Sequence, residues 1–406
     1  MIKRKLMASL VSGALALAAG AAQAQISDGV IKIGVVTDMS GLYADLTGNG
    51  SVVAARLAVE DFGAAKKGMK VEIISADHQN KPDVGSSIVR AWFDTDKVDV
   101  IADAPTSSVA LALSQITRDK NKVMLNSGAA TSDLTGKACS PNTVHWTYDT
   151  WMLANSTGSA IVKTGGSTWF FLTADYAFGH ALERDTEAVV TKNGGKILGK
   201  VRAPLNTQDF SSFLLQAQAS KAKIIGLANA GGDLINSIKQ AGEFGITKGG
   251  QNLAGLLVFL TDVHALGLEK TQGLIFTETF YWDLNDQTRA FAKRFAPLNN
   301  GKYPTMVHAG VYGAVLHYLK AVEALKSDDG TKVVAKMKEM PTDDPLFGKG
   351  MIRADGRKIH PAYLFEVKKP SESKGPYDYY KLRATVPADQ AFRPIDQGDC
   401  PLVAKK

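Results

Sequence analysis

Two stretches of small, hydroxyl-rich residues follow apolar runs, and such residues are suited to binding an anion. The stretch "PTSS" (105–108) ends the run 98–104, and "GAATS" (128–132) ends the run 122–129. In open parallel sheets, ligands bind beyond the carboxyl ends of the strands, where helix N-termini offer free N–H groups. Ordinary helix capping is the alternative use of these hydroxyl groups. The residues expected to contact a carboxylate or carbonyl ligand are Thr106, Ser107, Ser108, Ala129, Ala130 and Thr131.

Aromatic and very small residues occupy other expected strand ends. Tyr43 lies in the segment that follows the first apolar run, and Tyr176 and Phe178 follow a later one. Asn229 and Ala230 end a third run and are too small to fill the space beside them. We expect a ligand between a backbone wall and aromatic rings. The alternative is that Tyr176 and Phe178 cover the seam between a helix and the sheet.

Three adjacent aromatic residues, Phe280, Tyr281 and Trp282, cannot all point into one core. If the segment is extended, Phe280 and Trp282 face one side and Tyr281 faces the other. We expect at least one of them, with Tyr281 and Trp282 as the candidates, to line a ligand pocket. A structural cluster at a hinge is the alternative.

Motifs for catalysis are missing from the sequence. It contains no G-x-G-x-x-G after the first apolar run, no G-x-S-x-G and no H-E-x-x-H, and its 7 histidines are scattered. This pattern favours a binding protein over an enzyme, and we expect no cofactor and no metal site.

The elements that position these residues alternate between apolar runs and amphipathic stretches, which predicts parallel sheets covered by helices on both faces. Two such series predict two doubly wound, Rossmann-like α/β domains. The strands are expected at 30–39, 69–77, 98–104, 122–129, 167–175, 194–203, 223–230, 252–259 and 273–280. The helices are expected at 49–63, 83–95, 107–119, 150–163, 177–193, 210–221, 232–244, 286–298, 305–326 and 331–340.

The two series do not divide at a single linker, because the late helices complete the first sheet while the tail returns to the second domain. We expect crossings near 143–150 and 281–286 and a third within 345–362. The resulting division assigns 25–146 plus 284–355 to the first domain and 147–283 plus 356–406 to the second.

The N-terminus and the cysteines indicate an exported protein. A basic head, a short apolar run and the sequence Ala22-Gln23-Ala24 predict a signal peptide over 1–24, and no cysteine lies near the cleavage site to carry a lipid. Its removal lowers the formal net charge from +7 to +4, and no basic block indicates nucleic-acid binding. The expected compartment is a bacterial periplasm, where Cys139 and Cys400 form a disulfide; two buried thiols are the alternative.

The order of "IKIGVVTDMSG", "PTSSVA", "MLNSGAATSDLT", "DYAFG" and "GLIFTETFYW" resembles the periplasmic solute-binding proteins of branched-chain amino acid type ABC transporters. The resemblance implies a type I fold with a three-crossing hinge that closes over a small ligand without catalysis. It also implies a monomer that delivers the ligand to a membrane permease. In that family the ligand carboxylate is held at the positions matching Thr106, Ser107, Ala129 and Thr131, and an aromatic residue near 176–178 closes over it.

One departure from the family bears on the ligand. Amino-acid-binding members place an acidic residue at the end of the strand expected over 252–259, where this chain has Leu256, Leu257, Val258 and Phe259. A buried ammonium group there would be unpaired, and Asp233 and Asp262 are the remaining candidates to meet it. We therefore expect Leu257 to line a site for a carboxylate with an aromatic or apolar body. Amino acid binding, a sensor domain and an unrecognised hydrolase are the alternatives.

Overall fold

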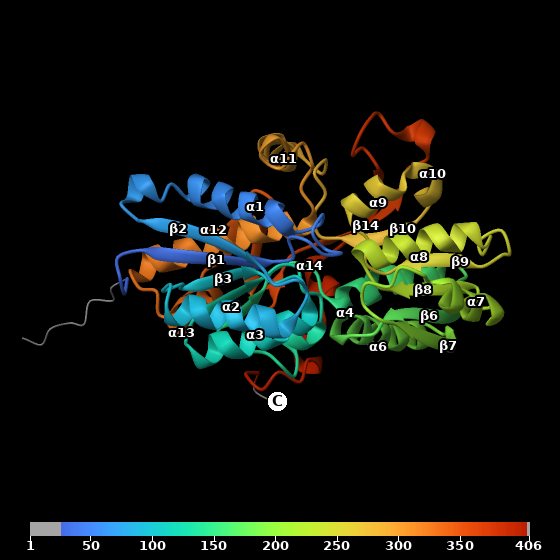
Figure 1. Cartoon of the computed structure of the whole chain (residues 1–406), viewed down its shortest axis with the longest axis horizontal. Coiled ribbons are helices and arrows are strands. Elements are labelled where there is room, and N and C mark those ends of the chain that lie inside the picture. Colours follow the sequence, from blue (N-terminus) through green and yellow to red (C-terminus); the bar gives the residue numbers. More distant parts are fainter. Residues whose placement is uncertain (1–25, 404–406) are drawn as a thin grey trace, which may run out of the picture.

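The computed structural model describes residues 26–403 and has two lobes that lie side by side (Figure 1). The first lobe contains a five-stranded parallel sheet with the order β2-β1-β3-β4-β5. β3 and β4 are fully buried, and β1 is buried at every residue except Lys32, as expected for apolar runs covered on both faces. The strands are β1 (Ile31–Thr37), β2 (Val71–Asp77), β3 (Val100–Asp103), β4 (Val123–Asn126) and β5 (Thr143–His145).

Helices cover both faces of this sheet. α12 is rich in alanine, glycine and valine and is buried along most of its length, which allows it to pack closely against α1. α2 and α3 pack against each other and lie below the sheet in Figure 1. The helices of this lobe are α1 (Gly48–Phe62), α2 (Pro82–Asp94), α3 (Ser107–Asp119), α11 (Asp286–Leu298), α12 (Met306–Leu325) and α13 (Gly330–Glu339).

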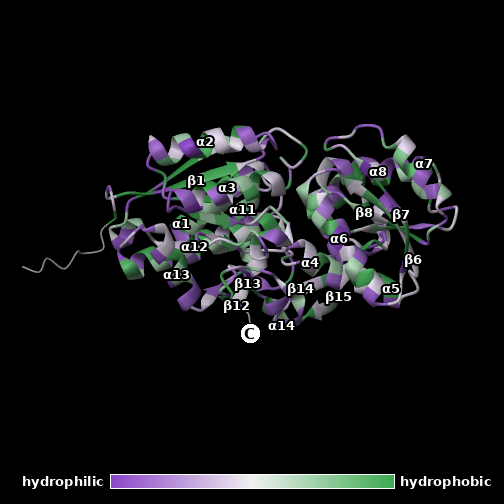
Figure 2. Cartoon of the chain, turned by 90° about the horizontal axis from the view of Figure 1, so that it is seen from below, coloured by the Kyte–Doolittle hydropathy of each residue, from purple (hydrophilic) through white to green (hydrophobic). Residues whose placement is uncertain are grey.

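The second lobe contains a four-stranded parallel sheet with the order β7-β6-β8-β9. Figure 2 shows hydrophobic strands in both lobes and helices with hydrophilic outer faces, as the alternating pattern predicts. The strands are β6 (Thr168–Ala174), β7 (Lys196–Ala203), β8 (Ile224–Ala228) and β9 (Asn252–Gly255). The helices are α4 (Thr150–Leu153), α5 (Ser159–Lys163), α6 (Ala177–Lys192), α7 (Ser211–Ala219), α8 (Gly231–Glu243), α9 (Leu260–Leu266) and α10 (Leu268–Thr271).

The remaining strands form two antiparallel sheets. The run 273–280 was expected to join the parallel series, but β10 pairs antiparallel with β14, which pairs with β15. The other small sheet has the order β11-β12-β13. These strands are β10 (Ile275–Glu278), β11 (Thr342–Asp344), β12 (Gly348–Ile352), β13 (Lys358–Ile359), β14 (Ala362–Val367) and β15 (Tyr380–Val386). A short helix, α14 (Ala388–Ala391), follows them.

A buried arginine joins two of the segments that cross between the lobes. Arg357, directly before β13, is 0% exposed. Its Nη1 lies 3.3 Å from a carboxylate oxygen of Asp149, which is the N-cap of α4, and its Nη2 donates to the carbonyl oxygen of Thr147. The first and third crossings are therefore held together by charge-assisted hydrogen bonds in a dry environment.

The end of the chain returns to the first lobe. Cys400 is disulfide-bonded to Cys139 with a Cα–Cα distance of 5.6 Å, and Arg393 donates a hydrogen bond to the carbonyl oxygen of Ser132. The structure thus contains the expected disulfide. These two bonds tie the last segment of the expected second domain (356–406) to Cys139 and Ser132 of the first lobe. We propose that the first lobe comprises 26–146, 284–359 and 388–403.

The signal peptide expected over residues 1–24 lies outside the described residues. Within residues 26–403, no helix is both long enough and apolar enough to cross a membrane.

Candidate ligand site between the lobes

The carboxyl ends of the strands in both sheets meet at a small cavity between the lobes. Six residues expected at a ligand site line it: Tyr43, Ala130, Tyr176, Phe178, Ala230 and Leu257. Five further residues line it: Leu46, Pro105, Gly128, Tyr148 and Phe259. Phe259 lies two residues after Leu257 and is the N-cap of α9. It could have been named from the sequence, because it ends the strand expected over 252–259. Tyr148 lies in the first crossing, expected at 143–150, where no strand end was expected to mark it.

The lobes touch each other across this cavity. The hydroxyl oxygens of Tyr43 and Tyr176 lie 2.6 Å apart, and the backbone N–H of Gly232 donates to the carbonyl oxygen of Leu42 at 3.2 Å. The cavity measures about 10 Å³, which is room for about one water molecule. A ligand therefore enters after the lobes separate or after the two tyrosine side chains turn away.

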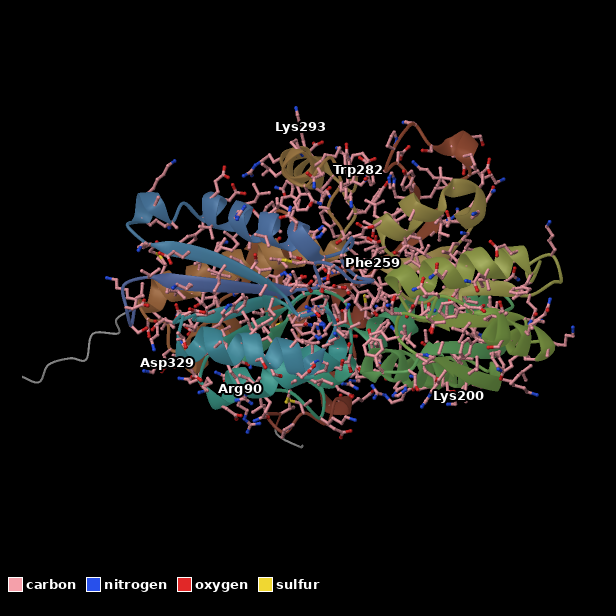
Figure 3. The ribbon with its side chains drawn as sticks, in the orientation of Figure 1. Arg90, Lys200, Phe259, Trp282, Lys293 and Asp329 are labelled. Carbon is pink, nitrogen blue, oxygen red and sulfur yellow. A yellow bond between two sulfur atoms is a disulfide. The ribbon has the colours of Figure 1, made fainter. Side chains whose placement is uncertain are left out.

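Five aromatic rings dominate the lining of the cavity. The rings of Tyr148 and Phe259 meet edge to face with centroids 5.8 Å apart, and those of Tyr176 and Phe178 lie at the same separation. Figure 3 places Phe259 where the two lobes meet. No charged side chain is among the lining residues. Such a lining favours a flat or apolar body over a charged one.

Three helix N-termini converge on the aromatic lining. The N-cap residues of α3, α6 and α8 are Thr106, Tyr176 and Ala230, and none of them forms a side-chain cap hydrogen bond. Thr106 instead donates its hydroxyl proton to the side-chain oxygen of Asn80. First-turn N–H groups without a side-chain cap, together with the helix dipole, favour a negative charge at this place.

The other expected hydroxyl and amide residues bind neighbouring protein groups outside the cavity lining. The hydroxyl oxygen of Ser107 accepts from the backbone N–H of Thr131 at 3.2 Å, and that of Thr131 accepts from the N–H of Asp133 at 3.3 Å. The side-chain amide of Asn229 donates to Ser237 at 2.9 Å. These bonds shape the wall behind the cavity. The expected contact residues that do not line the cavity are Thr106, Ser107, Ser108, Ala129, Thr131 and Asn229.

The run Phe280-Tyr281-Trp282 lies outside the cavity lining as well, so the expectation that one of them lines the pocket does not match the structure. The Tyr281 hydroxyl and the Trp282 indole N–H both donate to the carbonyl oxygen of Tyr377, each at 2.8 Å. Trp282 meets Tyr303 edge to face at 4.9 Å, and Figure 3 shows it toward α11. Tyr281 and Trp282 thus form an aromatic cluster with the C-terminal part of the chain, whereas Phe280 packs edge to face against Phe291 of α11.

Buried carboxyl groups surround the cavity without lining it. Burial raises the pKa of Asp103, Asp233 and Asp262 to about 7 each. Asp233 accepts from the backbone N–H of Asn206 at 3.1 Å, and Asp262 accepts from that of Phe259 at 2.9 Å. Both candidates for meeting an ammonium group therefore already bind backbone N–H groups.

No group of three or more His, Cys, Asp or Glu side chains is arranged to hold a metal ion in the described part of the chain.

Comparison with known proteins agrees with this architecture. A periplasmic binding protein from Burkholderia mallei is 53% identical, with a TM-score of 0.90 over 92% of this chain and 99% of that one. A branched chain amino acid ABC transporter periplasmic ligand-binding protein from Burkholderia xenovorans LB400 is 42% identical, with a TM-score of 0.81 over 92% and 99%. A solute-binding protein of an ABC transporter from R. palustris, in complex with benzoate, shares the fold at 21% identity, with a TM-score of 0.80 over 92% and 100%. Residues 30–375 match the periplasmic binding protein family, and the chain belongs to that family.

Proposed function

We propose that this protein captures a small carboxylate with an aromatic or apolar body between its lobes and delivers it to the permease of an ABC importer. The observation that carries the proposal is the combination of five aromatic rings with three helix N-termini at a cavity whose lining has no charged side chain. The helix ends suit the carboxylate and the rings suit its body.

The ligand has two parts, and each meets one kind of surface. Its carboxylate accepts from first-turn N–H groups near Pro105 and Ala130 of the first lobe. Its body takes the space now closed by Tyr43 and Tyr176 and is covered by Phe178 of the second lobe. Because each lobe supplies part of the contact, the ligand stabilises the closed arrangement over the open one.

Release of the ligand to a permease requires the two lobes to open again. The expected signal peptide supports a periplasmic location for the protein. In this proposal the protein binds and releases its ligand without catalysing a reaction, so a bound ligand is recovered unchanged.

Amino acid binding is the second candidate function. The Burkholderia xenovorans protein, named for branched chain amino acid transport, is 42% identical. An α-amino acid would place its ammonium group toward Asp233. Burial raises the pKa of Tyr43 and of Tyr176, and the nearby Asp233 carboxylate adds to both shifts. Asp233 would then have to exchange its bond from Asn206, and the apolar Leu257 and Phe259 would remain beside the charge.

A ligand panel tests the proposal. The mature protein is titrated by calorimetry with benzoate, phenylacetate, 4-methyl-2-oxopentanoate, leucine, isoleucine and valine, with benzamide as the uncharged counterpart of benzoate. We expect the acids without an ammonium group to bind and benzamide to bind more weakly. A ligand at a hundredfold its Kd should raise the unfolding free energy by about 2.7 kcal/mol. Binding restricted to the three amino acids would overturn the proposal in favour of the second candidate.

A further inference from the structure

A second cavity lies in the second lobe, away from the site between the lobes. It is a groove of about 510 Å³, within the size range of small-molecule sites. It is lined by the residues at the amino ends of β8, β9 and β10, whereas the site between the lobes lies at the carboxyl ends. The five residues of β8 alone separate the two by about 17 Å, at about 3.3 Å per residue.

The groove exists because the second lobe has no continuous sheet at this point. β9 is the edge of the four-stranded parallel sheet and β10 the edge of the antiparallel one, and no strand pairing joins them. Leu253 of β9 and Ile275 of β10 face the resulting gap, with Leu274 before β10. All the lining residues belong to the second lobe, so the groove persists whether the lobes are open or closed.

The floor and the mouth of the groove differ in chemistry. Apolar side chains come from five elements or their ends: Ile161, Ile224, Ile238, Leu253, Leu274 and Ile275. Lys223 and Lys270 are the charged residues of the lining, both are exposed, and no acidic side chain accompanies them.

Neither lysine is neutralised by a neighbour. The Lys223 ammonium group approaches the carbonyl oxygen of Gly165 at 3.5 Å, and the Lys270 ammonium group has no hydrogen bond or ion pair among residues 26–403. Two uncompensated positive charges beside an apolar floor attract one anionic group attached to an apolar chain.

We propose that this groove is a second binding site, which takes an amphiphilic anion such as a medium-chain carboxylate independently of lobe closure. The carboxylate lies between Lys223 and Lys270, and the alkyl chain covers Leu253, Leu274 and Ile275. This site differs from the one between the lobes in its elements, its charge and its independence of the hinge.

The test uses octanoate, with 1-octanol as the uncharged probe. Because octanoate also resembles a ligand for the site between the lobes, the titrations are made in the Gly231→Ala variant. A Cβ at Gly231 would lie 2.5 Å from the carbonyl oxygen of Leu42, which opposes closure. We expect octanoate to bind this variant, measured by calorimetry, and 1-octanol to bind more weakly.

Adding Lys223→Gln and Lys270→Gln should weaken octanoate binding by about tenfold or more, the size expected for lost charge-assisted contacts. The matched control replaces Lys192 and Lys196, two exposed second-lobe lysines that do not line the groove and whose neighbours in the sequence do not line it either, by glutamine and should leave octanoate affinity unchanged. No octanoate binding to the Gly231→Ala variant would overturn the proposal, as would equal weakening by the two lysine pairs. Benzoate binding by the wild type is a separate measurement, so failure of the groove and failure of the proposed transport ligand are distinguishable.

Discussion

The two tyrosine hydroxyl groups that meet across the cavity couple lobe closure to ligand binding at the residue scale. Tyr43 comes from the first lobe and Tyr176 is the N-cap of α6 in the second. Burial raises the pKa of Tyr176 above its usual value, so its hydroxyl stays protonated and available as a donor at neutral pH. A carboxylate in the cavity could accept from either hydroxyl when the two separate.

Two replacements of Tyr176 distinguish the contribution of its ring to ligand binding from that of its hydroxyl. We expect Tyr176→Ala to weaken binding of the carboxylate ligand by about tenfold or more, because an aromatic contact and its buried area are both lost. Tyr176→Phe keeps the ring and should weaken binding less. Calorimetric titration of both variants with the same ligand measures the difference. Unchanged affinity in Tyr176→Ala, with a lower melting temperature, would assign Tyr176 to packing alone.

Trp282, unlike Tyr176, is expected to contribute to stability and not to ligand binding. Its indole N–H donates to the carbonyl oxygen of Tyr377, and its ring packs against Tyr303. We expect Trp282→Ala to lower the unfolding free energy by roughly 2 kcal/mol, less than for a fully buried tryptophan because the side chain is partly exposed. Ligand affinity should stay within about twofold of the wild type, since the residue does not line the cavity. Urea unfolding and ligand titration of the same preparation measure the two effects. A loss of affinity without a loss of stability would return Trp282 to the ligand site.

At the scale of elements, the N-terminus of α8 decides how closely the lobes approach. Gly231 has a φ of +55°, and Gly232 donates its N–H to Leu42 of the first lobe. A side chain at Gly231 would meet the Leu42 carbonyl oxygen before the lobes reached the closed arrangement. The glycine pair therefore serves close approach of the two backbones.

Gly231→Ala is expected to weaken ligand binding by about tenfold or more, because the closed state loses its contacts while each lobe keeps its own fold. Small-angle X-ray scattering with saturating ligand should give a larger radius of gyration than for the wild type. Gly242→Ala is the control on the same helix, where an added Cβ meets nothing within 4 Å. It should keep wild-type affinity and, as a glycine-to-alanine change in a helix, raise stability by roughly 0.5–1 kcal/mol. Equal affinities of the two variants would show that this contact does not control closure.

At the scale of the whole molecule, the disulfide between Cys139 and Cys400 joins the C-terminal tail to the first lobe across 261 residues of sequence. We expect the double variant Cys139→Ser/Cys400→Ser to lose about 2–5 kcal/mol of unfolding free energy, because the bond restricts the unfolded chain. Guanidinium unfolding with and without a reductant measures this loss, and the reductant should affect only the wild type. A thiol assay on denatured, unreduced wild-type protein should find no reactive cysteine. Two thiols per chain in that assay would contradict the disulfide.

The sequence by itself determined most of the helices and strands, and it carried the resemblance to the family. Apolar runs and helical periodicity predicted β1 to β4 and β6 to β10, because long local patterns are set by neighbouring residues. The short strands β11, β12 and β13 were not predicted, because two to five residues carry too little pattern. The disulfide also followed from the compartment that the N-terminus indicates. The signal peptide over 1–24 stays a prediction.

Only the tertiary structure decided which strand-end residues share a cavity. Tyr43 and Tyr176 are 133 residues apart, and their contact depends on how the two lobes close. Ser107 and Thr131, both in the first lobe, bind each other behind the cavity wall. The return of the tail places the carbonyl oxygen of Tyr377 where it accepts from Tyr281 and Trp282. Side-chain partners of this kind are chosen by long-range packing and hydrogen bonding, which the local pattern of one sequence does not encode.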